Sequence, residues 1–440
     1  MIKKIDKGVL VFSMAYFLYR ITLDYLYVYL ISPVWEYNNF VLKINCSQYL
    51  LSYLWLIAII VFDYKLYRDT RPSSLFYILL DWLYFIPLGS ISPLANFPMT
   101  FFFFAFLYWV YSAILQTNVL HKSTEYYKPD EKVDYSSIAL IIMSLVILLN
   151  FVITIYYNGL HIKFDLEDVY DLRQDMKDLN MPAIVGYIKP MATSVLMILL
   201  LASIIHKKFV LVIILSLLEL VNFSFGALKS DLFILLIVYY AGFCYSSKHF
   251  IAILHVIIAF NLITILEFLI FQTSLLSSVI QRRLLFIPPL LSEEYYTYFS
   301  THELYYLRAS FLRWFGISNP YGVVPPNLIG SEYFGLEDMH ANTGIIGDDY
   351  AQFGWLSLLM YPYFRFLFMK LFDFCSKGVS TKITFFVSFQ LAYVFISTSF
   401  FAALLTCGSL MMCLVLYEDH RWCKRINYQH RPRISENHER

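Results

Sequence analysis

The sequence predicts an all-α polytopic membrane protein with about twelve transmembrane helices and one large outer loop between the ninth and tenth. Of its 440 residues, 59% are hydrophobic, 19% are aromatic and only 15% are charged. Soluble domains average about 45–50% apolar and about 25% charged residues. A soluble fold of this composition would expose large apolar patches. The composition therefore excludes a cytosolic enzyme, a nucleic-acid-binding protein and a disordered chain.

The apolar runs are the expected membrane spans, because a helix needs about 20 residues to cross the hydrocarbon layer. They lie at 9–32, 49–66, 75–93, 98–116, 137–157, 183–205, 209–224, 231–246, 250–271 and 350–372. A last run covers 383–418. As one helix it would be about 54 Å long, nearly twice the hydrocarbon thickness. We therefore divide it near Ser397–Phe400, which gives twelve spans.

The distribution of charge predicts the orientation. With the N-terminus inside, 21 of the 33 lysine and arginine residues fall in segments expected on the cytoplasmic side, as the positive-inside rule requires. An even number of spans places both termini in the cytoplasm, with a basic tail at 419–440. The first apolar run has no small-residue cleavage pattern, so we expect it to be retained. The chain 1–440 is thus expected to form one integral membrane domain.

Four arginines in the outer loop 272–349 lie where basic residues are normally depleted: Arg282, Arg283, Arg308 and Arg313. One interpretation is a set of amphipathic helices on the outer membrane surface, with arginines that reach the headgroups. The other is a site for an anionic ligand, because guanidinium groups suit phosphate oxygens. Both interpretations stay open. In the same segment, Tyr295 and Tyr296 suit either sugar faces or the headgroup region.

Two histidines of this loop, His302 and His340, are candidate general bases, because the histidine pKa lies near the working pH. Each could equally be a solvated loop residue. Asn342 and Asp348 lie near His340, in a segment where Gly344, Gly347 and Gly354 predict backbone turns. No HExxH, GxSxG, Walker or Rossmann pattern occurs, and the six cysteines show no metal-ligand spacing.

Charged residues inside the expected spans are the second class of candidate, because burying them in hydrocarbon is costly. Arg20 and Asp24 are spaced i,i+4 and should neutralise each other. Asp81, Glu219 and Glu267 fit either a polar cavity or helix packing. Lys229, at a polar break between two helices, either completes an anion pocket or is an interfacial lysine.

Several segments together resemble the Wzy-type polysaccharide polymerases, which extend bacterial O-antigens and capsules. The segments are DVYDLR (168–173), FGALKSDLF (225–233), RRLLFIPPLLSEEYYTYFS (282–300) and ANTGIIGDDYAQFGWLSLLMY (341–361). The many aromatic-rich spans match as well. The architecture matches over nearly the whole chain, but the motifs are confined to roughly 225–361 and are of moderate specificity. O-antigen ligases have a related outer loop.

The resemblance implies a glycosyltransferase without a metal or other cofactor, in the bacterial plasma (inner) membrane. Its donor would be a growing glycan on undecaprenyl diphosphate, its acceptor a lipid-linked repeat unit, and its partners the bilayer and a chain-length regulator. Arg282 and Arg283 would hold the diphosphate, Arg173 and Lys229 would add charge, and His302 or His340 would act as base. The alternatives are an O-antigen ligase, or a flippase or secondary transporter. A transporter is disfavoured because the two halves show no internal repeat.

Overall fold

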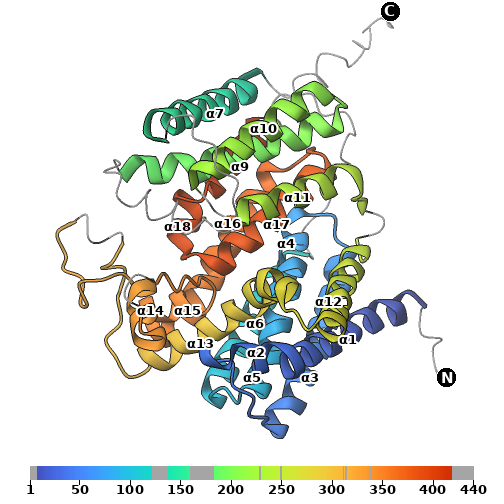
Figure 1. The fold of residues 1–440 in the computed structure, drawn as a ribbon, viewed down its shortest axis with the longest axis vertical. Helices are drawn as coiled ribbons and strands as arrows, with labels where there is room; N and C mark the ends of the chain where they lie inside the picture. The colour runs from blue at the N-terminus through green and yellow to red at the C-terminus, as the bar shows by residue number, and fades with distance from the viewer. Residues whose placement is uncertain are drawn as a thin grey trace, which may run out of the picture. The chain divides into compact units, whose positions relative to one another are not determined.

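The computed structural model describes residues 7–120, 137–158, 183–226, 229–247, 250–310, 312, 315–336 and 339–418, and within them the chain is helical and has no strand (Figure 1). Among the described residues, eight helices are long and apolar enough to cross a membrane: Gly8–Asn38, Cys46–Tyr67, Pro72–Leu94, Met99–Thr117, Ala139–Tyr157, Val185–Ile205, Ala252–Phe271 and Phe400–Glu418. Shorter apolar helices cover Phe209–Phe223, Asp231–Phe243 and Thr381–Ser397. The class of polytopic helical membrane protein is confirmed, whereas the count of twelve spans stays a prediction.

The chain divides into two compact units. Unit 1 comprises residues 1–124, 246–370 and 388–403, and unit 2 comprises residues 125–245, 371–387 and 404–440. Two helices, α16 (Ser357–Cys375) and α17 (Thr381–Ser397), contribute residues to both units.

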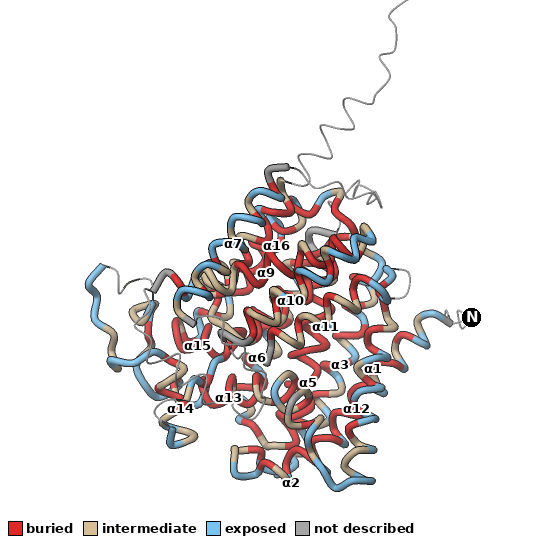
Figure 2. Tube along the Cα trace, turned by 45° about the horizontal axis from the view of Figure 1, so that its top comes forward, coloured by how far each residue is buried: buried red, intermediate tan, exposed pale blue. Residues whose placement is uncertain are grey.

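The core of unit 1 is the continuous helical span that follows Arg71. It consists of α4 (Pro72–Leu80), a π-helical turn η3 (Asp81–Phe85) and α5 (Ile86–Leu94). Of its most apolar 18-residue window, 94% is buried inside the protein, so this span is central rather than lipid-facing. Figure 2 shows the α5 region as buried, and all nine α5 residues are buried.

Other helices of unit 1 pack around this central span. The first run comprises α1 (Lys7–Leu26), η1 (Tyr27–Ile31), α2 (Ser32–Trp35) and η2 (Glu36–Asn38), and it is followed by α3 (Cys46–Tyr67), α6 (Met99–Leu120) and α12 (Ala252–Phe271). The α1 helix packs against α12 and α5, and α3 packs against α5. Within α1, Nε of Arg20 lies 2.7 Å from Oδ1 of Asp24, which confirms the predicted neutralising pair.

The segment expected as the large outer loop forms further helices of unit 1. A π-helical stretch, η5 (Ser277–Phe286), continues into α13 (Ile287–Phe299), and α14 (Pro325–Phe334), α15 (Gly347–Phe353) and the 3₁₀ turn η7 (Gly354–Leu356) follow. The α13 helix packs against α15 and α5, and nine of its residues are buried. It is therefore an internal element of unit 1.

The tenth expected run is divided in the structure. It was predicted as one helix over 350–372, but α15 ends at Phe353 and α16 begins at Ser357. Gly354 lies between them with a φ of +56°, a left-handed conformation that glycine adopts without a steric penalty. The predicted division near Ser397–Phe400 is present, because α17 ends at Ser397 and α18 (Phe400–Leu405) begins at Phe400.

Unit 2 is built on α9 (Ala183–Ile205), which packs against α7 (Ser137–Asn158), α10 (Phe209–Gly226) and α11 (Lys229–Phe243). The predicted break between 224 and 231 is present, since α10 ends at Gly226 and α11 begins at Lys229. Gly408 lies against α9, where an added Cβ would be 3.1 Å from the Met191 Cα atom.

Candidate functional site

Two of the predicted site residues, His302 and Arg308, lie in the loop that follows α13. The imidazole of His302 is exposed and stacks on the ring of Tyr298, with centroids 4.0 Å apart and 7° between the planes. Its Nδ1 atom lies 2.8 Å from the carbonyl oxygen of Tyr298 and 3.0 Å from Oγ1 of Thr301. These contacts fix the orientation of the ring.

The contact with the Tyr298 carbonyl also determines the tautomer of His302. A carbonyl oxygen only accepts hydrogen bonds, so in the neutral ring Nδ1 carries the proton and Nε2 carries the lone pair. Among the described residues, Nε2 has no hydrogen-bond partner. An exposed Nε2 with a free lone pair is the form of histidine that can accept a proton from a bound hydroxyl group.

Arg308 belongs to the same loop and supplies a positive charge. Its Nη2 lies 2.6 Å from Oε1 of Glu303, and its guanidinium also donates to the carbonyl oxygens of Leu304 and Tyr305. The two residues before it, Tyr306 and Leu307, have φ values of 49° and 62°. A side-chain-bearing residue rarely adopts this conformation, and such backbone strain gathers at functional sites.

Aromatic rings line this loop. The hydroxyl of Tyr321 donates to the carbonyl oxygen of Glu303 at 2.7 Å, and the Tyr321 ring lies 5.2 Å from that of Tyr305 and 6.3 Å from that of Tyr298. Tyr298 and Tyr321 are partly exposed. We call Tyr298, His302, Glu303, Arg308 and Tyr321 the His302 site. It combines a candidate base, a cation and aromatic faces.

Arg282 and Arg283 lie near the other end of the same helical run. The guanidinium of Arg282 lies over the indole ring of Trp35, 5.1 Å from its centroid, while Arg283 is exposed. Phe299 follows Arg282 by 17 residues, or about 25 Å along the axis of the run. The run therefore separates the two arginines from the loop of His302, and among the described arginines it is Arg308 that belongs to this loop.

A buried carboxyl group that the sequence interpretation missed lies on α13, beyond Arg282. Oε1 of Glu294 accepts a hydrogen bond of 2.9 Å from Nδ2 of Asn39, which follows Trp35 by one helical turn. Glu294 is 2% exposed, and its Oε2 atom has no hydrogen-bond partner among the described residues. Burial raises the pKa of Glu294 to about 8, with a smaller contribution from the charge of Glu293. In the sequence, the two adjacent glutamates of the aromatic segment SEEYY were the feature that could have indicated this buried carboxyl group.

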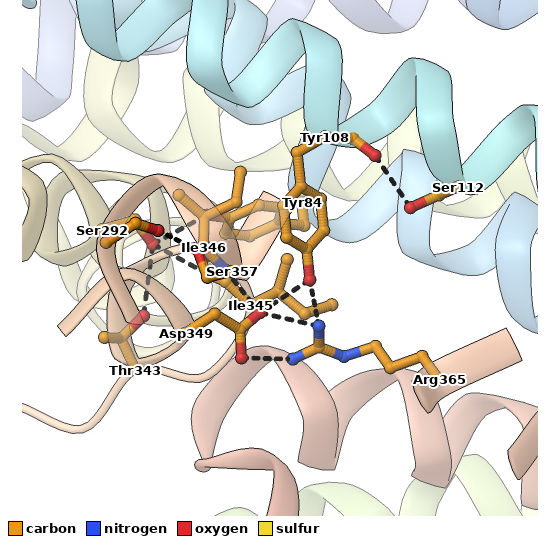
Figure 3. Close-up of polar contacts among 11 residues, drawn as sticks. Tyr84, Tyr108, Ser112, Ser292, Thr343, Ile345, Ile346, Asp349, Ser357 and Arg365 are labelled. Atoms are coloured by element: carbon orange, nitrogen blue, oxygen red, sulfur yellow. Dashed lines mark hydrogen bonds and ion pairs between the residues drawn. The ribbon is translucent and has the colours of Figure 1, made fainter. Parts of the chain in front are cut away.

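Asp348 and Asp349 are neighbours with different surroundings. Asp349 is fully buried and is held by Arg365 of α16 through two hydrogen bonds of 2.7 and 3.0 Å. The hydroxyl of Tyr108 donates to the same carboxylate at 2.6 Å, and Figure 3 shows Arg365 directed at Asp349. Asp348 accepts from Gln352 at 3.2 Å, and burial, then the charge of Asp349, raises the pKa of Asp348 to about 7.

The network drawn in Figure 3 continues into the segment before α15. The Tyr84 hydroxyl donates to Oγ of Ser292 at 2.7 Å, and Ser292 lies 3.2 Å from the Thr343 hydroxyl. Ile346 has a φ of 69°, an outlier for a β-branched residue, and its N–H donates to Asp349 at 3.3 Å. Gly344 is required by close approach, because an added Cβ would lie 2.1 Å from the carbonyl oxygen of Phe395.

The other predicted residues have several locations. Tyr295 and Tyr296 are buried: the Tyr295 hydroxyl donates to the Ala341 carbonyl at 2.9 Å, and the Tyr296 ring packs on Tyr350 at 4.5 Å. In this conformation their rings are covered. His340 and Asn342 are exposed, and the N–H of Asn342 donates to the His340 carbonyl at 2.9 Å. Arg173 and Arg313 lie outside the described residues, as does the side chain of Lys229.

Within the described ranges, no group of three or more His, Cys, Asp or Glu side chains is arranged to hold a metal ion. Comparison with protein-family models, with curated proteins and with solved structures found no match to this chain. The functional interpretation therefore depends on the residues and their geometry.

Proposed function

We propose that this protein is a polysaccharide polymerase that transfers a growing glycan from undecaprenyl diphosphate onto a lipid-linked repeat unit, at the outer face of the bacterial plasma membrane. The observation that carries the proposal is the His302 site. There, an exposed imidazole with its lone pair on Nε2 lies in one loop with an arginine and two partly exposed tyrosine rings. This loop belongs to the segment on which the resemblance to the polymerases depends.

The proposed reaction needs a base and a cation. The acceptor hydroxyl oxygen attacks C1 of the donor sugar, the bond from C1 to the diphosphate oxygen breaks, and the hydroxyl proton passes to Nε2 of His302. Undecaprenyl diphosphate leaves with the bonding electron pair. Arg308 stabilises the negative charge that develops on the leaving group, because it stays charged and offers donors suited to phosphate oxygens.

A polymerase of this kind has two lipid-linked substrates, and the separation between Arg308 and Arg282 fits that requirement. The acceptor reacts at the end of its repeat unit, so its own diphosphate lies several sugars away from the reacting hydroxyl. Arg282 and Arg283, about 25 Å from Phe299 along the helical run, suit that second diphosphate. This assignment differs from the resemblance alone, which gave both arginines to the donor.

The test is His302→Gln in cells that lack the chromosomal copy of the gene. Glutamine cannot accept the proton, so we expect surface glycan of single repeat units with normal protein levels and normal attachment. His255→Gln is the matched control, because His255 is also exposed and its Nδ1 also lies near the carbonyl oxygen four residues earlier, at 3.0 Å. His340→Gln tests the other predicted base.

Three results would contradict the proposal. A ladder of normal chain length in both His302→Gln and His340→Gln would exclude a histidine base. Loss of all surface glycan in the deletion strain, including single units, would indicate a flippase, and single or long chains that stay unattached would indicate a ligase.

A further inference from the structure

Unit 2 contains a group of polar side chains from four helices, all of them buried except Lys189, which is half-buried. The group comprises Asn150 of α7, Lys189 and Thr193 of α9, Glu219 and Asn222 of α10, and Asp231 of α11, and we call it the unit 2 polar cluster. Glu219 is fully buried, and Asn150, Thr193, Asn222 and Asp231 are each at most 7% exposed. Ionisable groups at such depth in apolar helices are costly and are generally functional.

Asn222 connects the members of the cluster. Its Nδ2 donates to Oγ1 of Thr193 at 2.8 Å and more weakly to Oε2 of Glu219 at 3.4 Å. Its Oδ1 accepts from Nδ2 of Asn150 at 3.1 Å. Lys189 is close enough to interact electrostatically with both Asp231 and Glu219. The six side chains therefore form one site.

Two oxygen atoms of this site lack a donor. Oε1 of Glu219 and Oδ1 of Asn150 are buried and have no hydrogen-bond partner among the described residues. The Glu219 carboxylate interacts with Asp231, which repels a second negative charge, and with Lys189 among the described side chains. A buried carboxylate oxygen without a donor is costly in a low-dielectric interior. The open Oε1 atom of Glu219 therefore indicates a place for a bound cation.

We propose that the unit 2 polar cluster binds one monovalent cation, a proton or Na⁺, with Glu219 as its main ligand. One positive charge neutralises the Glu219 carboxylate, whereas a divalent ion would leave a charge of +1 beside it. The carboxylate, amide and hydroxyl oxygens suit a hard cation, and ionisable groups of this kind hold protons or Na⁺ in membrane proteins. Among the described side chains, Lys189 and Asp231 are the charged groups that face Glu219, and α7 contributes the Asn150 amide.

Cation binding would be a property of unit 2 alone. Its test does not depend on the proposed glycosyl transfer. The test uses the purified full-length protein in detergent, with NaCl exchanged for choline chloride at constant ionic strength and fixed pH. A ligand that binds only the folded state raises the unfolding temperature. If the cation is Na⁺, we expect this rise in the wild type and its loss in Glu219→Gln. Glu267→Gln, a half-buried carboxylate on α12, is the control and should keep the rise.

If the cation is a proton, Na⁺ has no effect, and the infrared difference spectrum between the wild type and Glu219→Gln shows a protonated carboxyl band that belongs to Glu219. Should that variant fail to fold, direct binding of radioactive Na⁺ to the wild type and to Asn150→Leu replaces it. Loss of the Asn150 oxygen should weaken Na⁺ binding by about tenfold or more. A wild type with neither a Na⁺ response nor the carboxyl band overturns the proposal, as does a Na⁺ response that survives Glu219→Gln.

Discussion

Among the ionisable residues, surroundings rather than residue type separate the candidates for chemistry from the structural groups. His302 and His340 are equivalent in the sequence, but a carbonyl contact orients only the ring of His302. Asp348 and Asp349 are adjacent, yet only Asp349 has an arginine partner. Sequence patterns identified His302, His340 and Asp348 because of their types and positions. They missed Glu294, because its burial depends on Asn39, which lies 255 positions away in the sequence.

The pKa of Glu294 predicts how stability depends on pH. A glutamate in the unfolded chain has a pKa of about 4.3, whereas burial raises that of Glu294 to about 8. The folded state therefore favours the protonated form. The stabilisation is complete below about pH 4.3 and falls by about 1.4 kcal/mol per pH unit until it is lost above pH 8. Thermal unfolding in detergent between pH 6 and 9 should show this fall.

Glu294→Gln removes this titrating group and should flatten the pH dependence of the unfolding temperature between pH 7 and 8, above the pKa of about 7 of Asp348. Glu332→Gln changes an exposed glutamate of α14 and serves as the control. A slope that is as steep in Glu294→Gln as in the wild type would show that Glu294 is ionised in the folded protein.

At the level of helices, the length of an apolar run predicts well that a helix is present. It predicts poorly how that helix packs against others. The ends of α3, α9 and α12 lie within three residues of their predicted positions, because a change in hydropathy marks them. The interior place of α13 could not be predicted, since its burial depends on contacts with α15 and α5. The separation of α15 from α16 depends on a single φ angle at Gly354, which neighbouring apolar residues conceal.

The ion pair between Asp349 of α15 and Arg365 of α16 should be strongly coupled. Both side chains are at most 3% exposed, and Arg365 also lies against the rings of Tyr108 and Tyr361. Arg365→Met leaves a buried carboxylate without its partner, which should cost about 3–5 kcal/mol of unfolding free energy. Asp349→Leu should cost a similar amount.

The double variant Arg365→Met/Asp349→Leu should be destabilised by far less than the sum of the two single variants, because no lone charge stays buried. Unfolding temperatures in detergent of the wild type, the two single variants and the double variant measure this coupling. Arg308→Met, at a partly exposed pair with Glu303, should cost at most about 1 kcal/mol. Additive effects at Asp349 and Arg365 would show that the pair does not fix α15 against α16.

At the scale of the whole molecule, the low charge content has two components. Of the 33 basic residues, 21 lie in segments expected on the cytoplasmic side, whereas others lie in the segment 272–349, and Lys189 lies half-buried in unit 2. The sequence could predict the first component, because orientation depends on loop charge. It could not predict that a helical run separates Arg282 from the loop that contains Arg308, or that Lys189, Glu219 and Asp231 converge. Those arrangements arise only when the helices pack.

Glycan elongation by the purified protein is the most direct test of the proposed function. The protein is reconstituted in liposomes with lipid-linked repeat units extracted from a strain in which its gene is deleted. The wild type should produce a ladder of longer chains, and His302→Gln should produce none. If the wild type yields no product longer than one repeat unit, or if His302→Gln elongates as fast as the wild type, the assignment of a polymerase with its base at His302 is contradicted.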